Sequence, residues 1–131
     1  MLNFRLLTIV LSLVPNPAVT PGVVRPLTVV QVCTIKWGLD ARHVTVGMKQ
    51  EIAANYGLTL AEISGKGLCC VYDHLIPRQL AGADAVGNIW VQPWASAHAK
   101  DVEENRLHRA VCAGTLALVD AQRIMRGWGQ R

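Results

Sequence analysis

The sequence has few charged and few aromatic side chains, and it lacks any long apolar run. Only 17% of its 131 residues are charged and 5% are aromatic, whereas 51% are hydrophobic. This composition excludes a disordered polyelectrolyte, because the chain can bury enough apolar surface to offset the entropy of ordering. No apolar run approaches the roughly 20 residues of a membrane-spanning helix, so we expect no membrane insertion of the mature chain.

The length allows one domain and is too short for two. The formal net charge is +4. A basic surface suits a polyanionic partner, although many domains carry as much charge for solubility alone. Charge therefore permits nucleic acid as a partner without identifying it, and the sequence does not indicate an oligomeric state.

Acidic residues are absent before Asp40. Arg5 precedes a short apolar stretch over residues 6–14, which is the layout of a secretory signal. We expect residues 1–14 to be a signal peptide and the chain to be exported, to the periplasm or outside the cell. The alternative is a buried amino-terminal strand or helix of a chain that stays in the cytoplasm.

Four prolines fall within residues 15–27, so this segment is expected to be extended, either exposed or laid flat over the domain. Residues 28–131 then form a single domain. Residues 28–36 fit either a strand or a helical turn. The remaining patterns predict a helix over 42–56 with Thr45 as its N-cap, strands over 68–73 and 88–92, and helices over 97–113 and 118–126.

The helix over 97–113 is expected to begin at a Ser96 cap, with its charged residues facing outward. Its inward face would consist of Val102, Leu107, Ala110 and Val111. Strands and helices together predict an α+β fold. The segment from the first strand to this helix contains the chain's most distinctive polar residues.

Those residues are Asp73 and His74 at the end of the first strand, Asn88 at the start of the second, and His98 near the start of the helix. Asn88 follows His74 by fourteen residues, and His98 follows Asn88 by ten. An imidazole titrates near neutral pH, which suits a general base, and a neutral imidazole is also a metal ligand. The pattern indicates hydrolytic or metal chemistry.

The segment Val71-Tyr72-Asp73-His74-Leu75-Ile76-Pro77-Arg78-Gln79-Leu80-Ala81-Gly82, followed by Asn88-Ile89-Trp90 and by His98, resembles the HNH endonuclease superfamily of ββα-metal nucleases. The stretches around residues 19–22, 32–34, 90–108 and 111–114 are similar to a bacterial branch of small, exported HNH-like proteins. The resemblance implies a fold in which a ββα-metal hairpin and helix form the core, with flanking helices.

The same resemblance implies hydrolysis of nucleic-acid phosphodiester bonds with little sequence specificity, DNA being favoured over RNA. His74 corresponds to the general base, and Asn88 corresponds to the residue that fixes the loop and helps to orient that base. Asp73 and His98 correspond to the ligands of one divalent metal ion, Mg²⁺, Mn²⁺ or Zn²⁺, which would stabilise charge on the phosphate.

Basic residues lie beside these positions. Arg78 follows the first strand, and Lys100 and Arg106 lie on the helix that contains His98. We expect these three side chains to bind phosphates without reading bases. The alternative is a solvated helix face, with the basic side chains paired to neighbouring acids.

The four cysteines contain no Cys-x-x-Cys pair, which argues against a structural zinc module. In an exported chain four cysteines permit three pairings. The resemblance to the exported branch favours a Cys33–Cys112 disulfide, because both residues lie in stretches similar to that branch. Cys69 and Cys70 are adjacent. They are either buried free thiols, which we favour, or a bridge between neighbours, which would be strained; without export all four cysteines would be reduced.

Two functions follow from the sequence. The first is an exported, metal-dependent, non-specific HNH-type endonuclease. The second is a non-catalytic exported domain that uses the same scaffold for binding. The two are distinguished by whether Asp73 and His98 converge on one metal and by whether the protein turns over nucleic acid.

Overall fold

The computed structural model describes Arg5, residues 13–63 and residues 69–130. Within these residues the chain is a mixed α+β protein with one two-stranded antiparallel sheet and five α-helices. In chain order the elements are α2 (Val29–Thr34), α3 (Val46–Asn55), α4 (Leu60–Ile63), β1 (Cys70–His74), the 3₁₀ turns Arg78–Leu80 and Val86–Asn88, β2 (Ile89–Pro93), α5 (Trp94–Cys112) and α6 (Leu118–Arg126).

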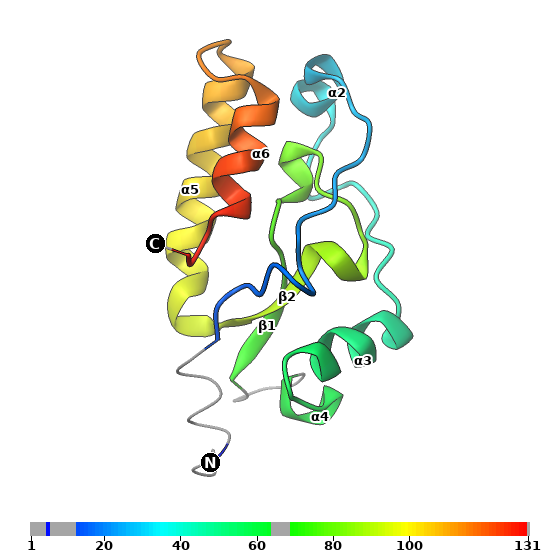
Figure 1. The fold of residues 1–131 in the computed structure, drawn as a ribbon. Coiled ribbons are helices and arrows are strands. Elements are labelled where there is room, and N and C mark those ends of the chain that lie inside the picture. The colour runs from blue at the N-terminus through cyan, green and yellow to red at the C-terminus, as the bar shows by residue number, and fades with distance from the viewer. Residues whose placement is uncertain (1–4, 6–12, 64–68, 131) are drawn as a thin grey trace.

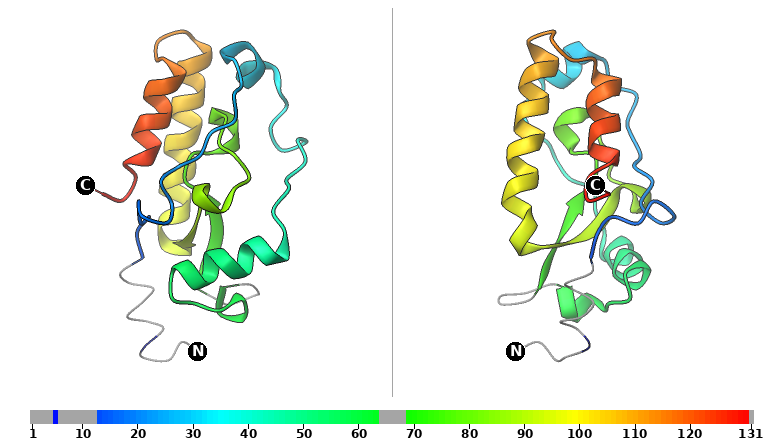
Figure 2. Two further views of the ribbon diagram at one scale, coloured as in Figure 1. Left: turned by 45° about the vertical axis from the view of Figure 1, so that its right-hand side comes forward. Right: turned by 60° about the vertical axis from the view of Figure 1, so that its left-hand side comes forward.

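The two strands form a hairpin that runs directly into the longest helix (Figure 1). Asp73 pairs with Trp90 and His74 with Ile89, so the end of β1 lies beside the start of β2. Two hydrophobic clusters pack around this hairpin, one toward α3 and α4 and the other between the loop after β1, α5 and α6. Figure 2 shows α5 and α6 side by side, with α3 and α4 at the opposite end of the molecule.

Capping side chains explain where α2 and α3 begin. The hydroxyl of Thr45 accepts from the amide of Met48, which confirms Thr45 as the N-cap of α3. The ambiguous stretch 28–36 contains a helix, because Thr28 and Gln31 form a reciprocal capping box.

Helix α5 differs from the expectation at its start and on its buried face. It begins at Trp94, directly after Pro93, so the expected Ser96 cap is wrong. Val102 is 53% exposed, whereas Lys100 and Glu104 are buried. These two residues continue, at helical spacing, the stripe formed by the buried Leu107 and Val111, and hydrophobic periodicity alone could not find them.

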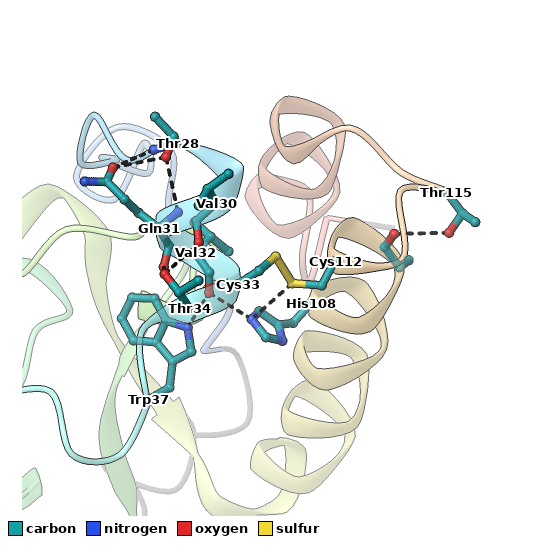
Figure 3. The surroundings of a disulfide bond; sticks show 11 residues. Thr28, Val30, Gln31, Val32, Cys33, Thr34, Trp37, His108, Cys112 and Thr115 are labelled. Carbon is teal, nitrogen blue, oxygen red and sulfur yellow. Dashed lines mark hydrogen bonds between the residues drawn. A yellow bond between two sulfur atoms is a disulfide. The ribbon is translucent and has the colours of Figure 1, made fainter.

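The disulfide Cys33–Cys112 is present and joins α2 to the end of α5 (Figure 3). It closes a loop with a sequence separation of 79 residues. Cys69 and Cys70 are also bonded to each other, so the expectation of two free thiols is wrong.

The Pro-rich segment lies extended across the loop between β1 and β2 (Figure 1). The amide of Gly22 donates to the carbonyl of Gly87, and the amide of Arg25 donates to that of Ala81. The predicted signal peptide over residues 1–14 falls almost wholly outside the described residues. Among the helices the structure describes, none is both long and apolar enough to cross a bilayer.

Candidate functional site

The candidate site lies where β1 ends and the loop to β2 begins. His74, the last residue of β1, is 7% exposed. It lines a cavity of about 430 Å³ together with side chains from the loop and from α5. The charged residues around this cavity include Asp40, Arg42, Asp73, Arg78, Asp101 and Glu104.

The imidazole of His74 is held by a carboxylate that the sequence analysis did not identify. His74 Nε2 lies 2.7 Å from Asp84 Oδ1. Burial lowers the pKa of His74 below its usual value, and the hydrogen bond and charge of Asp84 only partly oppose this effect. The ring is therefore neutral at pH 7, as a general base must be.

Asp84 is itself fixed in an ionised state. Burial alone would raise the pKa of Asp84, but the amide of His43, the His74 ring and the Arg78 guanidinium outweigh burial and lower it. Because an ionised carboxylate only accepts hydrogen bonds, the Nε2 atom of His74 carries the proton and Nδ1 keeps a free lone pair. Asp84 lies in a polar loop, where no local pattern distinguishes it from an ordinary turn residue.

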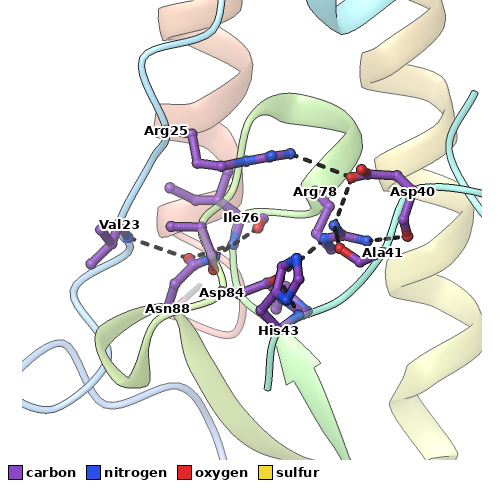
Figure 4. A network of polar contacts seen from close by, with 11 residues as sticks. Val23, Arg25, Asp40, Ala41, His43, Ile76, Arg78, Asp84 and Asn88 are labelled. Carbon is purple, nitrogen blue, oxygen red and sulfur yellow. Dashed lines mark hydrogen bonds and ion pairs between the residues drawn. The ribbon is translucent and has the colours of Figure 1, made fainter. Parts of the chain in front are cut away.

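Asn88 is fully buried and holds the loop between the strands (Figure 4). Its side-chain amide donates to the carbonyls of Ile76 and Ala83, and its oxygen accepts from the amides of Ile76 and Val23. These contacts are of the loop-fixing kind that the resemblance implied. They reach the backbone after His74 and not its ring.

Close approach of the backbone in this loop also depends on Gly82. A Cβ atom at Gly82 would lie 1.7 Å from the carbonyl oxygen of Ile76, which no side chain permits. Asn88 and Gly82 together therefore hold the turn after His74 in one compact conformation.

Arg78 is almost fully engaged within the protein (Figure 4). Its guanidinium contacts Asp40 at 2.6 Å and Asp84 at 3.2 Å, and its side chain is 10% exposed. Arg78 thus lies beside the proposed base, as the sequence predicted. Its positive charge is already neutralised by two carboxylates of the protein, so little of it is available to a phosphate.

Asp73 lies beside His74 in sequence but pairs with a different group. Its Oδ2 is 2.8 Å from the ammonium of Lys100 and accepts from the indole N–H of Trp90. The same ammonium donates to the carbonyl of His74 at 2.7 Å and lies 3.4 Å from Glu104 Oε1. Burial, reinforced by nearby carboxylates, raises the pKa of Glu104 to about 7 despite the opposing charge of Lys100.

His98 does not meet Asp73. Lys100, two residues further along α5, is fully buried against Asp73, while His98 is exposed. Residues two apart on a helix point about 200° apart, so His98 faces away from the site. The Asp73–His98 pair therefore does not fit the role of a metal-ligand set.

Within the described ranges, no group of three or more His, Cys, Asp or Glu side chains is arranged to hold a metal ion. The Asp73 oxygen nearest the helix is already paired with an internal cation, Lys100. We accordingly assign no chemical step to a metal held by Asp73 and His98.

The expected phosphate-binding residues on α5 have different environments. Lys100 has no exposed surface, so the prediction that it contacts nucleic acid is wrong for this fold. Arg106 is exposed and paired with Glu103 at 2.6 Å, and its role as a phosphate contact stays a prediction.

Arg42 is the exposed cation that the sequence analysis missed. It lines the cavity, lies near enough to His74 to lower that residue's pKa, and forms no ion pair with a carboxylate in the part of the chain that the structure describes. No motif singles it out, because it lies in an irregular segment before α3.

Comparisons with family models, with curated proteins and with solved structures find no match for the chain.

Proposed function

We propose that the protein hydrolyses phosphodiester bonds of nucleic acid with little sequence preference, with His74 as the general base. The observation that carries this proposal is the buried His74–Asp84 pair at the edge of a cavity that also contains Arg42. A neutral imidazole, oriented by a carboxylate and facing a cation, suits attack of water on an anionic ester.

The described side chains and solvent water supply the proton transfers of the step. Nδ1 of His74 accepts a proton from water while the water oxygen forms a bond to phosphorus. The bond from phosphorus to one sugar oxygen then breaks, and that oxygen takes a proton from solvent. Arg42 would bind a non-bridging phosphate oxygen, and Asp84 stabilises the imidazolium that forms.

The order of elements supports the resemblance to ββα nucleases. His74 ends β1, Asn88 precedes β2, and α5 follows β2 without a break. The departure is on α5, where Lys100 and not His98 faces Asp73. The proposal therefore keeps the base and the loop-fixing asparagine from the resemblance and leaves out its two metal ligands.

The test is cleavage of supercoiled plasmid and of single-stranded DNA and RNA by the full chain with its disulfides intact. Reactions would contain Mg²⁺, Mn²⁺ or EDTA. We expect wild-type protein to cut, and His74→Ala to reduce the rate by about 100-fold or more, the usual scale of a lost general base. His98→Ala should cut as wild type does, which makes it the matched control.

Absence of cleavage in every arm, or equal residual cleavage by wild type and His74→Ala, would contradict the proposal. Cleavage that EDTA abolishes would show that a divalent ion is required, and cleavage that His98→Ala retains would show that His98 is not one of its ligands. The His74→Ala variant thus tests the identity of the base, and the EDTA reactions test the need for a metal ion.

A second candidate is a binding domain without turnover. Two observations favour it. Asp73 and His98 do not converge on one site, and Asp73 and Arg78 are both neutralised by partners inside the protein. It predicts that wild type and His74→Ala bind the same oligonucleotide equally and that neither cuts it.

A further inference from the structure

A second cavity lies beside His74, and the proposed reaction does not use it. It has a volume of about 310 Å³. Val44, Val71 and Ile89 form its apolar walls, and the ring of Tyr72 lines it as well. A cavity with apolar walls and an aromatic ring suits a flat or partly apolar group.

The two cavities meet at two shared residues, His74 and Arg42, which line both. A ligand centred on His74 can therefore extend in two directions. Such an arrangement fits a linear polymer, since a substrate that ended at the reacting bond would need only one of the two spaces.

The charges of the two cavities differ in a way that favours an anion in the second. The described residues lining the second cavity include the cations Arg42 and Lys49 and no carboxylate. The first cavity has four carboxylates, from Asp40, Asp73, Asp101 and Glu104.

Lys49 extends from α3 with its ammonium 5.6 Å from the centre of the Tyr72 ring. Among the residues that the structure describes, no carboxylate forms an ion pair with Lys49. Its charge is thus available to a ligand, whereas the charges of Lys100 and Arg78 are already matched.

We propose that the second cavity binds the nucleotide next to the phosphate at His74, with Lys49 contacting its backbone phosphate and the sugar or base lying against the apolar walls. This inference rests on the proposed function and identifies its substrate as a nucleic-acid strand that continues on both sides of the reacting bond.

Binding is tested without turnover on the His74→Ala chain, using a fluorescein-labelled single-stranded DNA of twelve nucleotides. Lys49→Met is expected to weaken binding by about 5-fold and to reduce the slope of log K against log salt by about 0.7, the contribution of one phosphate contact to a single strand. Lys49→Arg keeps the charge and should bind as the parent does. Lys36→Met, an exposed lysine that lines neither cavity, is the control.

Turnover gives a second measurement on the chain with His74 intact. Lys49→Met should raise KM for DNA several-fold with kcat unchanged. It should leave hydrolysis of bis(p-nitrophenyl) phosphate unchanged, because that small diester has no neighbouring phosphate for Lys49 to contact.

Equal binding by Lys49→Met and Lys36→Met would overturn the inference, and so would an equal loss on DNA and on the small diester. If the wild type cuts neither substrate, the proposed function fails, while the binding comparison still decides whether the second cavity holds nucleic acid.

Discussion

Lys100 Nζ lies 2.8 Å from Asp73 Oδ2, and the lysine has no exposed surface. A fully buried ammonium is stable only when paired and hydrogen-bonded. Here Asp73, Glu104 and the carbonyl of His74 supply the partners, all of them oxygens. The ion pair thus ties the middle of α5 to the end of β1 that carries the proposed base.

Removing the ammonium should therefore be costly. Lys100→Met leaves the half-buried carboxylate of Asp73 without its cationic partner, and we expect a loss of about 3 kcal/mol in the free energy of unfolding at pH 7. Urea denaturation followed by tryptophan fluorescence measures it. Lys36→Met, at an exposed position, should change stability by less than about 0.5 kcal/mol. Equal stability of the two variants would show that the ion pair is not holding α5 to β1.

Glu104 should make stability depend on pH. Its pKa is raised from 4.5 to about 7 in the folded chain, so the folded state binds this proton more tightly than the unfolded state does. The stabilisation is complete below about pH 4.5 and is lost as pH rises toward 7, an effect on the order of 3 kcal/mol. Glu104→Gln cannot lose a proton at this position.

The difference in unfolding free energy between wild type and Glu104→Gln isolates this effect, since every other titrating group is common to both. We expect the wild type to lose stability relative to the variant between pH 4.5 and 8. Parallel stability curves over that range would contradict the raised pKa.

The pH profile of cleavage should report the environment of His74. Burial lowers its pKa below 6.5, with Arg42 acting in the same direction and Asp84 and Asp73 opposing. The acidic limb of kcat/KM is therefore expected below pH 6.5, and activity should stay constant from there toward neutral pH.

Asp84→Asn removes the main group that raises the pKa of His74, so the acidic limb should move to still lower pH. It also removes the orientation of the ring, and we expect kcat/KM to fall by about 100-fold, as misplacement of a catalytic group does. If the acidic limb of kcat/KM moved to higher pH in Asp84→Asn, or if the variant kept wild-type activity, Asp84 would not be the partner of the base.

The long-range disulfide should contribute more stability than the adjacent one. Replacing Cys33 and Cys112 by serine opens a loop with a sequence separation of 79 residues, which costs about 4 kcal/mol by loop entropy. Cys69 and Cys70 are neighbours, so their bond restricts almost no loop. The double variant Cys69→Ala/Cys70→Ala, which puts no hydroxyl at the buried position 70, should melt closer to wild type in calorimetry than the Cys33/Cys112 variant. A reversed order would refute the loop argument.

The parts of the fold that depend on local signals could be predicted from the sequence. The Thr45 cap, the two short strands and the helix over 118–126 follow from capping chemistry, β-branched runs and apolar spacing. The partners of charged groups could not be predicted. A loop, a strand and the first turns of α5 separate Asp73 from Lys100 in the sequence. Only the packing of α5 shows that the Lys100 side chain points inward.

The candidate site shows the same division. His74 and Asn88 were identified because they stand at characteristic spacings, and the structure places them around one turn. Asp84 and Arg42 lie in irregular segments, where no spacing or periodicity distinguishes a functional acid or arginine from a surface residue. His98 was assigned to the site because its spacing fitted a motif. The buried residues Lys100 and Leu107 determine which face of α5 points inward, and His98 is not on that face.

The pairing of Val24 with Gly82 has a practical consequence for anyone who shortens the chain. The backbone of residues 22–25 is hydrogen-bonded to the same turn that contains Asp84, the partner of His74. This segment therefore helps to hold the proposed base in position. A recombinant form that starts after the last of the early prolines would keep both strands and every proposed reactive side chain, yet it would release the turn that aligns them.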